Sequence, residues 1–164
     1  MKIISIEEKP FHKIRFITAG PKGKVRKRDL PFYRVFVDSL PKGMSSFIAT
    51  SDLQGRESGR GNRLLGEVVA EELSFLQEKK EVKSIDLVLL AGDLYEYPDC
   101  HKLGSTGDVT PVYNAFADKF KSVVGVHGNH DTIEGVLNKN IYILEANSIL
   151  QQGLNYWRCF RGYR

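Results

Sequence analysis

Three short, mostly apolar segments of the chain predict β-strands, and each ends abruptly in polar residues. They are residues 46–50 (SFIAT), 85–91 (IDLVLLA) and 122–126 (SVVGV). The second is nearly all apolar, which is typical of a strand that is covered on both faces. Between the first two, apolar residues recur at spacings of three and four over residues 62–80, which predicts an amphipathic helix with one buried stripe.

A second helix and a fourth strand extend this pattern. Residues 111–121 predict a helix with Thr110 as its N-cap and Pro111 at its first helical position, and residues 141–144 (IYIL) predict a short strand. The alternation of strands and helices predicts an α/β sheet with parallel crossovers. Ligands of such sheets gather beyond the carboxyl ends of the strands, so the polar residues after the strands are expected to share one rim.

The N-terminal region has a different pattern and a strong positive charge. Residues 14–19 and 32–37 predict strands from their aromatic and β-branched content, with residues 20–28 as the loop of a hairpin. Residues 1–45 hold 11 Lys or Arg and 4 Asp or Glu, whereas residues 46–153 hold 10 and 16 respectively. The acidic middle region suits cations, and the chain lacks the uniform positive charge of many nucleic-acid binders.

Three polar motifs follow the three apolar strands. Asp52 and Gln54 are two residues apart, so they would face the same side of an extended segment. Asp93 comes at the end of the next strand, and Asn129 and His130 follow the third. Carboxylate, amide and imidazole ligands in this mixture suit Mn, Mg, Fe or Zn. A carboxylate such as Asp93 can bridge two ions, which together bind a phosphate and generate a hydroxide nucleophile.

Each motif also has a purely structural explanation. An Asp after an apolar strand often caps a helix or forms a turn, which applies to Asp93, and Asn129 before His130 is also typical of a turn. Gln54 alone is uninformative, and His127 is explained as a loop residue. The occurrence of all three motifs after consecutive predicted strands favours a functional site.

Residues 47–153 resemble the calcineurin-like metallophosphoesterase family, whose pattern is D-x-H, G-D, G-N-H-[DE], a lone His and G-H-x-H. The first three motifs correspond in order and spacing to SDLQG (Asp52), AGDLYEYP (Asp93) and GVHGNHD (Asn129, His130 and Asp131). The resemblance implies an α/β fold, a β-sandwich flanked by helices. It also implies an enzyme that hydrolyses phosphomonoesters or phosphodiesters at a dinuclear metal site.

The resemblance further implies a role for each matching residue. Asp52 and Asp93 would bind the first divalent ion, with Asp93 bridging to the second. Asn129 would bind the second ion and touch the substrate phosphate. His130 would act as a general acid or stabilise the transition state, and Asp131 would orient it.

The sequence departs from the family pattern in two places. Gln54 stands where the family usually has His, and an amide oxygen is a weaker ligand with a preference for harder ions. No histidine follows His130, so the lone His and G-H-x-H are absent and the second ion has only Asp93 and Asn129. We therefore expect a fold that is incomplete at the C-terminus and an activity that is impaired.

The predicted organisation has three parts. Residues 1–45 form a basic hairpin segment packed on the domain, residues 46–153 form the metallophosphoesterase-like core, and residues 154–164 form an atypical basic tail. One hypothesis for the tail is a frameshift, because one choice of codons for residues 156–164 encodes small residues in the next frame. The alternative is a genuine short C-terminal strand or arm. A missing sheet half would expose an apolar edge, so self-association is expected.

Three functions remain open on these grounds. They are metal-dependent hydrolysis of phosphate esters, a non-catalytic relic or binding module with the same fold, and a nucleic-acid or phosphoprotein binder. The last would use residues 22–28 (KGKVRKR), which otherwise form a solvated loop. The absence of a long apolar segment and of a secretory signal predicts a cytoplasmic protein without membrane association. Two distant cysteines agree with a reducing compartment.

Overall fold

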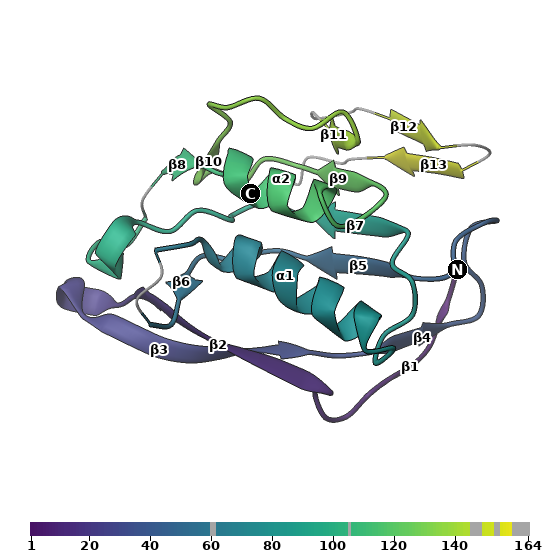
Figure 1. The fold of residues 1–164 in the computed structure, drawn as a ribbon, viewed down its shortest axis with the longest axis horizontal. Coiled ribbons are helices and arrows are strands. Elements are labelled where there is room, and N and C mark those ends of the chain that lie inside the picture. The colour runs from purple at the N-terminus through teal and green to yellow at the C-terminus, as the bar shows by residue number, and fades with distance from the viewer. Residues whose placement is uncertain (60–61, 105, 145–148, 153–154, 159–164) are drawn as a thin grey trace.

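The fold is built around a parallel sheet of four strands (Figure 1). The computed structural model of the chain describes residues 1–59, 62–104, 106–144, 149–152 and 155–158. The strand order in the sheet is β11-β9-β7-β5. These strands are β5 (Phe47–Thr50), β7 (Leu87–Leu90), β9 (Val123–Gly125) and β11 (Ile141–Ile143). All four lie within segments predicted as strands, and each neighbouring pair is parallel, as expected.

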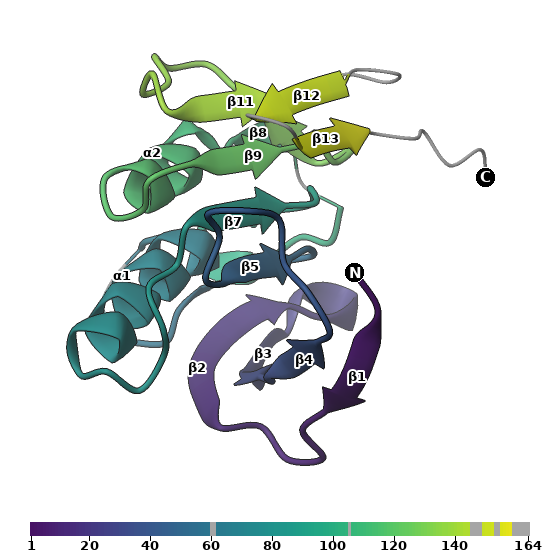
Figure 2. The ribbon, with the colours of Figure 1, turned by 90° about the vertical axis from the view of Figure 1, so that its right-hand side faces the viewer.

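The two α-helices of the described chain lie on one face of this sheet (Figure 2). They are α1 (Leu65–Glu78) and α2 (Thr110–Ala117), and each connects two parallel strands. The strands follow one another across the sheet in chain order, so right-handed crossovers place both helices on the same side. The predicted α/β class is therefore confirmed.

Both helices begin and end slightly differently from the prediction. The carboxylate of Glu67 accepts the backbone N–H of Leu64 at 2.8 Å, which fixes the start of α1 after residues 62–64. The prediction of Thr110 as the N-cap of α2 is wrong, because Thr110 is the first helical residue. Asp108 performs the capping role, since its Oδ1 accepts the N–H of Thr110 at 2.9 Å. The end of α2 at Ala117 is also earlier than predicted.

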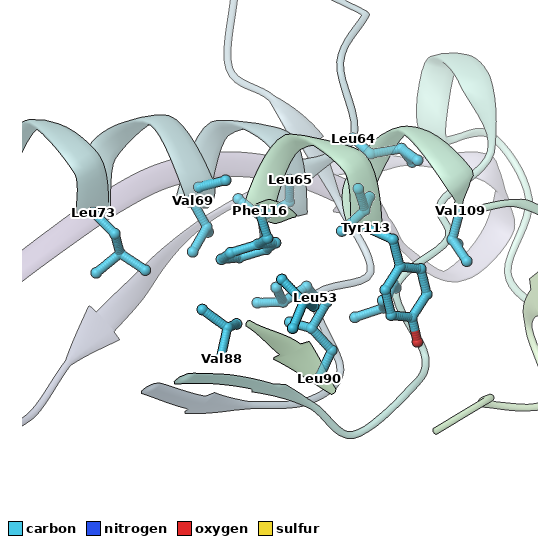
Figure 3. Close-up of a cluster of buried hydrophobic side chains, with 14 of the residues drawn as sticks. Leu53, Leu64, Leu65, Val69, Leu73, Val88, Leu90, Val109, Tyr113 and Phe116 are labelled. Carbon is cyan, nitrogen blue, oxygen red and sulfur yellow. The ribbon is translucent and has the colours of Figure 1, made fainter. Parts of the chain in front are cut away.

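The main hydrophobic core lies between the helices and the parallel sheet (Figure 3). Leu65 and Leu73 of α1 and Phe116 of α2 are almost completely buried against Val88 and Leu90 of β7. Burying a side chain of this size contributes roughly 1.5–3 kcal/mol. The spacing of apolar residues at intervals of three and four predicted this buried face of α1. The same core packs against the strands that lead to the polar motifs.

A long antiparallel hairpin covers another side of the core. Its strands are β2 (His12–Ala19) and β3 (Val25–Phe32), and β2 also pairs with β6 (Arg56–Glu57). Ile14 and Phe16 of β2 join the main core. A hairpin was predicted here, but with residues 32–37 as its second strand and residues 20–28 as its loop. The second strand is instead β3, which begins within the predicted loop, because Val25 already pairs with Ala19.

The predicted strand over residues 32–37 is wrong as a continuous element. The hairpin strand ends at Phe32, and β4 (Val35–Val37) pairs with β1 (Ile3–Ile6), a strand that was not predicted. Between them, the N–H of Arg34 donates to the Glu7 carboxylate at 3.3 Å and redirects the chain. The self-association expected from the sequence stays a prediction. Exposed apolar side chains lie on the pair formed by β1 and β4. They are Ile3, Ile4, Ile6, Val35 and Phe36.

The remaining described elements are short. They are the 3-10 turns η1 (Pro21–Gly23) and η2 (Pro98–Cys100) and the strands β8 (Gly107–Asp108), β10 (Asp131–Thr132), β12 (Ile149–Gln152) and β13 (Asn155–Arg158). Within the predicted basic tail, residues 155–158 form β13, which pairs with β12, while 159–164 lie outside the described residues. None of the described helices is long and apolar enough to cross a membrane.

Candidate metal centre

The loops that follow β5, β7 and β9 lie side by side at the carboxyl ends of these strands (Figure 1). The backbone N–H of Asp52 donates to the carbonyl of Gly92 at 3.0 Å, one residue before Asp93. On the other side of β7, the N–H of Val126 donates to the carbonyl of Leu90 at 3.0 Å. The backbone thus brings the three sequence motifs to one edge of the sheet.

Two of the predicted ligands have an uncommon backbone conformation. Asp52 has a φ of 53° and Asp93 a φ of 56°, both in the left-handed region. For a residue with a Cβ, this conformation costs roughly 1–2 kcal/mol, although Asp tolerates it better than most residues. Such residues cluster at functional sites, where the surrounding structure holds them in place. Nothing in the residue types alone indicated this strain.

The conformation of Asp52 also changes one expectation. Asp52 and Gln54 were expected to lie on one extended segment, but the left-handed φ interrupts the extended backbone at Asp52. Leu53 between them is fully buried in the core, whereas Asp52 is exposed and Gln54 is half-buried. The alternation of side chains along a strand therefore does not place Gln54 relative to Asp52.

The carboxylate of Asp93 has an oxygen that lacks a hydrogen-bond partner. Its Oδ1 atom is buried, and within the described ranges it is the one buried side-chain nitrogen or oxygen without a partner. Burying an acceptor without a donor costs roughly 1–3 kcal/mol, and more for a charged group. A cation is the kind of group that would satisfy this oxygen, so Asp93 fits the metal-binding role that the sequence suggested.

Two glycines allow the second and third loops to touch at Asp93. Gly92 has a φ of 86°, and a Cβ on it would lie 2.5 Å from the backbone nitrogen of Gly128. A Cβ on Gly128 would overlap the backbone nitrogen and the carboxylate of Asp93. The glycines of the G-D and G-N-H-D motifs are thus required by the contact between the two loops.

Asp131 connects the same two loops through its side chain. Its Oδ1 accepts the backbone N–H groups of Leu94 at 2.7 Å and Tyr95 at 3.2 Å, and its Oδ2 accepts the N–H of Gly128 at 3.1 Å. This fixes the residue directly after Asp93 to the third motif. The sequence did not indicate this role for Asp131, and its expected action on His130 stays a prediction.

Asn129 and His130 form a turn at the edge of this site. Asn129 is exposed, and His130 is half-buried. The backbone carbonyl of His130 accepts the N–H of Gly107 at 3.1 Å. The Cε1 atom of the His130 ring lies 3.9 Å from where a Cβ on Gly104 would be. The pairing of β10 with β8 continues this contact. Gly104 and Gly107 therefore hold His130 next to the candidate site.

The described residues contain no cluster of three or more His, Cys, Asp and Glu side chains that could hold a metal ion. A site at this edge therefore depends on Asp52 and Asp93 together with amide ligands. Two of the other histidines have partners outside the three motifs. His12 pairs with the Glu72 carboxylate at 2.9 Å, and the ring of His101 packs against Tyr97.

Glu96 is a buried carboxylate near the site that the sequence predictions missed. It is only 4% exposed, and its Oε2 accepts the hydroxyl of Thr18 at 2.7 Å and the N–H of Ala19 at 3.0 Å. The guanidinium of Arg56 donates to the Glu96 carbonyl at 3.0 and 2.7 Å. These bonds join the second motif loop to the basic hairpin. The position of Glu96 between two tyrosines was a weak sign of burial.

Comparison with known proteins agrees with this arrangement. A model of the calcineurin-like phosphoesterase family matches residues 45–163, which is well over half of the chain. The chain therefore belongs to the calcineurin-like phosphoesterase family, whose members act on phosphate esters and use divalent metals. Searches of curated proteins and of solved structures found no match.

Proposed function

We propose that this chain hydrolyses phosphate esters with divalent ions. Asp52, Asp93 and Gln54 would hold the first ion, and Asp93 and Asn129 would hold a second. The observation that carries the proposal is the buried Oδ1 of Asp93, which has no donor at the junction of the three motif loops. Because the ligand set consists of carboxylate and amide oxygens, Mn or Mg suits it better than a softer ion.

The ion, when bound, would polarise the phosphate and lower the pKa of a water molecule. In the hydrolysis, a water oxygen would form a bond to phosphorus and release a proton to solvent as the ester P–O bond breaks. The leaving alcohol needs a proton, and we assign its delivery to His130, which Gly104 and Gly107 hold beside the site. The Asn129 amide would donate a hydrogen bond to a non-bridging phosphate oxygen.

The two departures from the family pattern lead to a specific expectation about metal binding. The first ion has Asp52, Asp93 and Gln54, whereas a second ion has only Asp93 and Asn129. Two protein ligands hold an ion weakly, because the rest of its coordination shell remains water. We therefore propose that the second ion binds much more weakly than the first and limits the activity of this chain.

The test measures metal binding and turnover separately. Added Mn should raise the melting temperature of the wild-type chain, since a ligand that binds only the folded state stabilises it. It should also support hydrolysis of bis-p-nitrophenyl phosphate. Asp93→Asn and Asp52→Asn should lose both effects. Asp99→Asn is the matched control, because Asp99 shares the left-handed backbone of both ligands, with a φ of 64°, and is exposed like Asp52. A Mn response that persists in Asp93→Asn would overturn the metal site.

A non-catalytic binding module is the alternative. It is favoured by the absence of any histidine after His130 and of a cluster of three acidic, His or Cys ligands in the described residues. In that case Mn would still raise the melting temperature, but no phosphate ester would be hydrolysed with Mn, Mg, Fe or Zn. Turnover that disappears in Asp93→Asn and persists in Asp99→Asn would exclude this alternative.

A further inference from the structure

The hairpin formed by β2 and β3 carries the strongest concentration of positive charge in the described chain. The five basic residues within 22–28 are all exposed: Lys22, Lys24, Arg26, Lys27 and Arg28. We call these residues the basic tip. In the part of the chain that the structure describes, none of the five has an acidic side chain within 4.0 Å. Their charge is therefore available to an external partner.

The register of the hairpin places two arginines of the basic tip on one face. Arg26 lies opposite Thr18 and Arg28 opposite Phe16, and directly opposed residues of antiparallel strands share a face. Thr18 donates its hydroxyl to the Glu96 carboxylate, so this is the face that meets the second motif loop. Arg26 is held against the turn, since its Nε lies 2.8 Å from where a Cβ on Gly20 would be.

A continuous chain of contacts runs from the basic tip to the candidate metal centre. Turn η1 lies beside η2 (Figure 1), and a Cβ on Gly23 would lie 3.3 Å from the carbonyl of His101. The segment after η2 continues to Gly104, which lies next to the ring of His130. The bonds from Glu96 to Thr18 and Ala19 fix the hairpin to this segment. A ligand on the basic tip would thus lie close to the proposed site of hydrolysis.

We infer that the basic tip binds the sugar–phosphate backbone of a single-stranded polynucleotide and positions its phosphodiesters at the candidate metal centre. This inference rests on the proposed function for the chemistry, but the binding itself does not require the metal. Residues two apart on a strand are separated by about 6.8 Å, so the basic tip presents several separate cations. One small phosphate ester cannot contact them all, whereas a polymer with a charge on every unit can.

The location of the hairpin supports a role in substrate choice. Residues 1–44 lie outside the matched family region, yet the bonds of Glu96 make the hairpin part of the surroundings of the second motif. The acidic composition of residues 46–153 also leaves the basic tip as the region suited to a polyanion. The hairpin would therefore add a substrate preference to a general phosphoesterase core.

The test measures binding of a fluorescein-labelled, 20-nucleotide single-stranded oligonucleotide by fluorescence anisotropy. The buffer contains EDTA, which removes divalent ions, so the affinity does not depend on the metal site. The variant Lys24→Gln/Arg26→Gln/Arg28→Gln should bind about tenfold or more weakly, and the slope of log K against log salt should fall by about 2, since each lost phosphate contact removes roughly 0.7. The control Lys119→Gln/Lys121→Gln/Lys139→Gln removes three exposed charges near the opposite ends of the strands and should bind like the wild type.

Each outcome decides the inference. Equal binding by the two triple variants, or no binding by the wild type at low salt, would overturn it. It would also be overturned if the basic-tip variant lost affinity for phosphatidylserine vesicles while the wild type ignored the oligonucleotide, because the partner would then be a membrane surface. Loss of oligonucleotide binding with unchanged hydrolysis of bis-p-nitrophenyl phosphate would support it. Binding in EDTA without any hydrolysis in Mn would support it and reject only the proposed function.

Discussion

The carboxylate of Asp131 accepts the backbone N–H of Leu94 at 2.7 Å, and this contact joins the third sequence motif to the second. Further bonds from Tyr95 and Gly128 complete the connection. Asp131 therefore acts as a positioning residue for Asp93, which directly precedes Leu94. Asp131 directly follows the histidine of the third motif, a position for which the sequence suggested a catalytic role. The backbone N–H groups that Asp131 accepts indicate a structural role.

Asp131→Asn should lower the free energy of unfolding by about 1–3 kcal/mol, because an amide nitrogen replaces an acceptor that faces backbone N–H groups. It should also reduce the rise in melting temperature caused by Mn. Urea unfolding with and without Mn measures both effects. Glu134→Gln is the control, since Glu134 is exposed and its amide replacement still accepts the hydroxyl of Thr132. An unchanged Mn response in Asp131→Asn would remove the positioning role.

Asp93→Asn should make the metal-free chain more stable while removing its response to Mn. The Oδ1 of Asp93 is buried without a hydrogen-bond donor, so this oxygen is removed from water without compensation. An amide removes the charge and tolerates the left-handed φ. We expect a gain of roughly 0.5–2 kcal/mol in EDTA, as is common where a functional residue opposes stability. Thermal unfolding in EDTA measures it, and a clear loss of stability there would contradict the prediction.

Gly128→Ala should disrupt the contact between the second and third motif loops. The added methyl group would overlap the backbone and the carboxylate of Asp93, so we expect a loss of about 1–3 kcal/mol together with weaker Mn binding. Gly43→Ala is the control, because Gly43 has a left-handed φ of 81° and open space around it. Its cost should be about 1 kcal/mol from the backbone alone, with the Mn response unchanged.

Asp108 should contribute stability that disappears in acid. Burial opposes its ionisation, but hydrogen bonds from Thr110 and from the N–H of Glu134 outweigh burial and lower the pKa of Asp108 below its usual value. A lowered folded pKa means that the stabilisation is complete above the unfolded pKa of about 3.9 and is lost as the pH falls through the folded value.

Comparison of the wild type with Asp108→Asn isolates this effect. The variant should be less stable by about 0.5–2 kcal/mol at pH 7, the usual contribution of a helix-capping residue. The difference should stay constant down to about pH 5 and shrink below about pH 4. Urea unfolding at a series of pH values measures it. A difference that grows in acid would contradict the assignment.

The sequence predicted the parallel sheet and the common edge of the motifs well, because both depend on local patterns. Apolar runs such as residues 85–91 are long enough to specify a buried strand, and parallel crossovers then bring Asp52, Asp93 and Asn129 to one edge. The hydrophobic spacing in residues 62–80 likewise fixed the buried face of α1.

Other features depend on contacts between distant residues and left no local pattern. The left-handed φ of Asp52 is supported by the bond from its N–H to Gly92, forty positions later. The burial of Glu96 depends on Thr18 and Ala19 in a hairpin far away in the sequence. The pairing of β1 with β4 is of the same kind. In each case the partner decides the structure, and the residue type alone does not.

The order of strands in the parallel sheet affects how this chain can fold during synthesis. From β5 through β7 and β9 to β11, every strand joins the edge left by the one before it. A polypeptide that leaves the ribosome at roughly 5–20 residues per second can therefore extend the sheet in one direction, without reopening a pairing already made. The first two motif aspartates can therefore come together before β9 adds the third motif to the sheet.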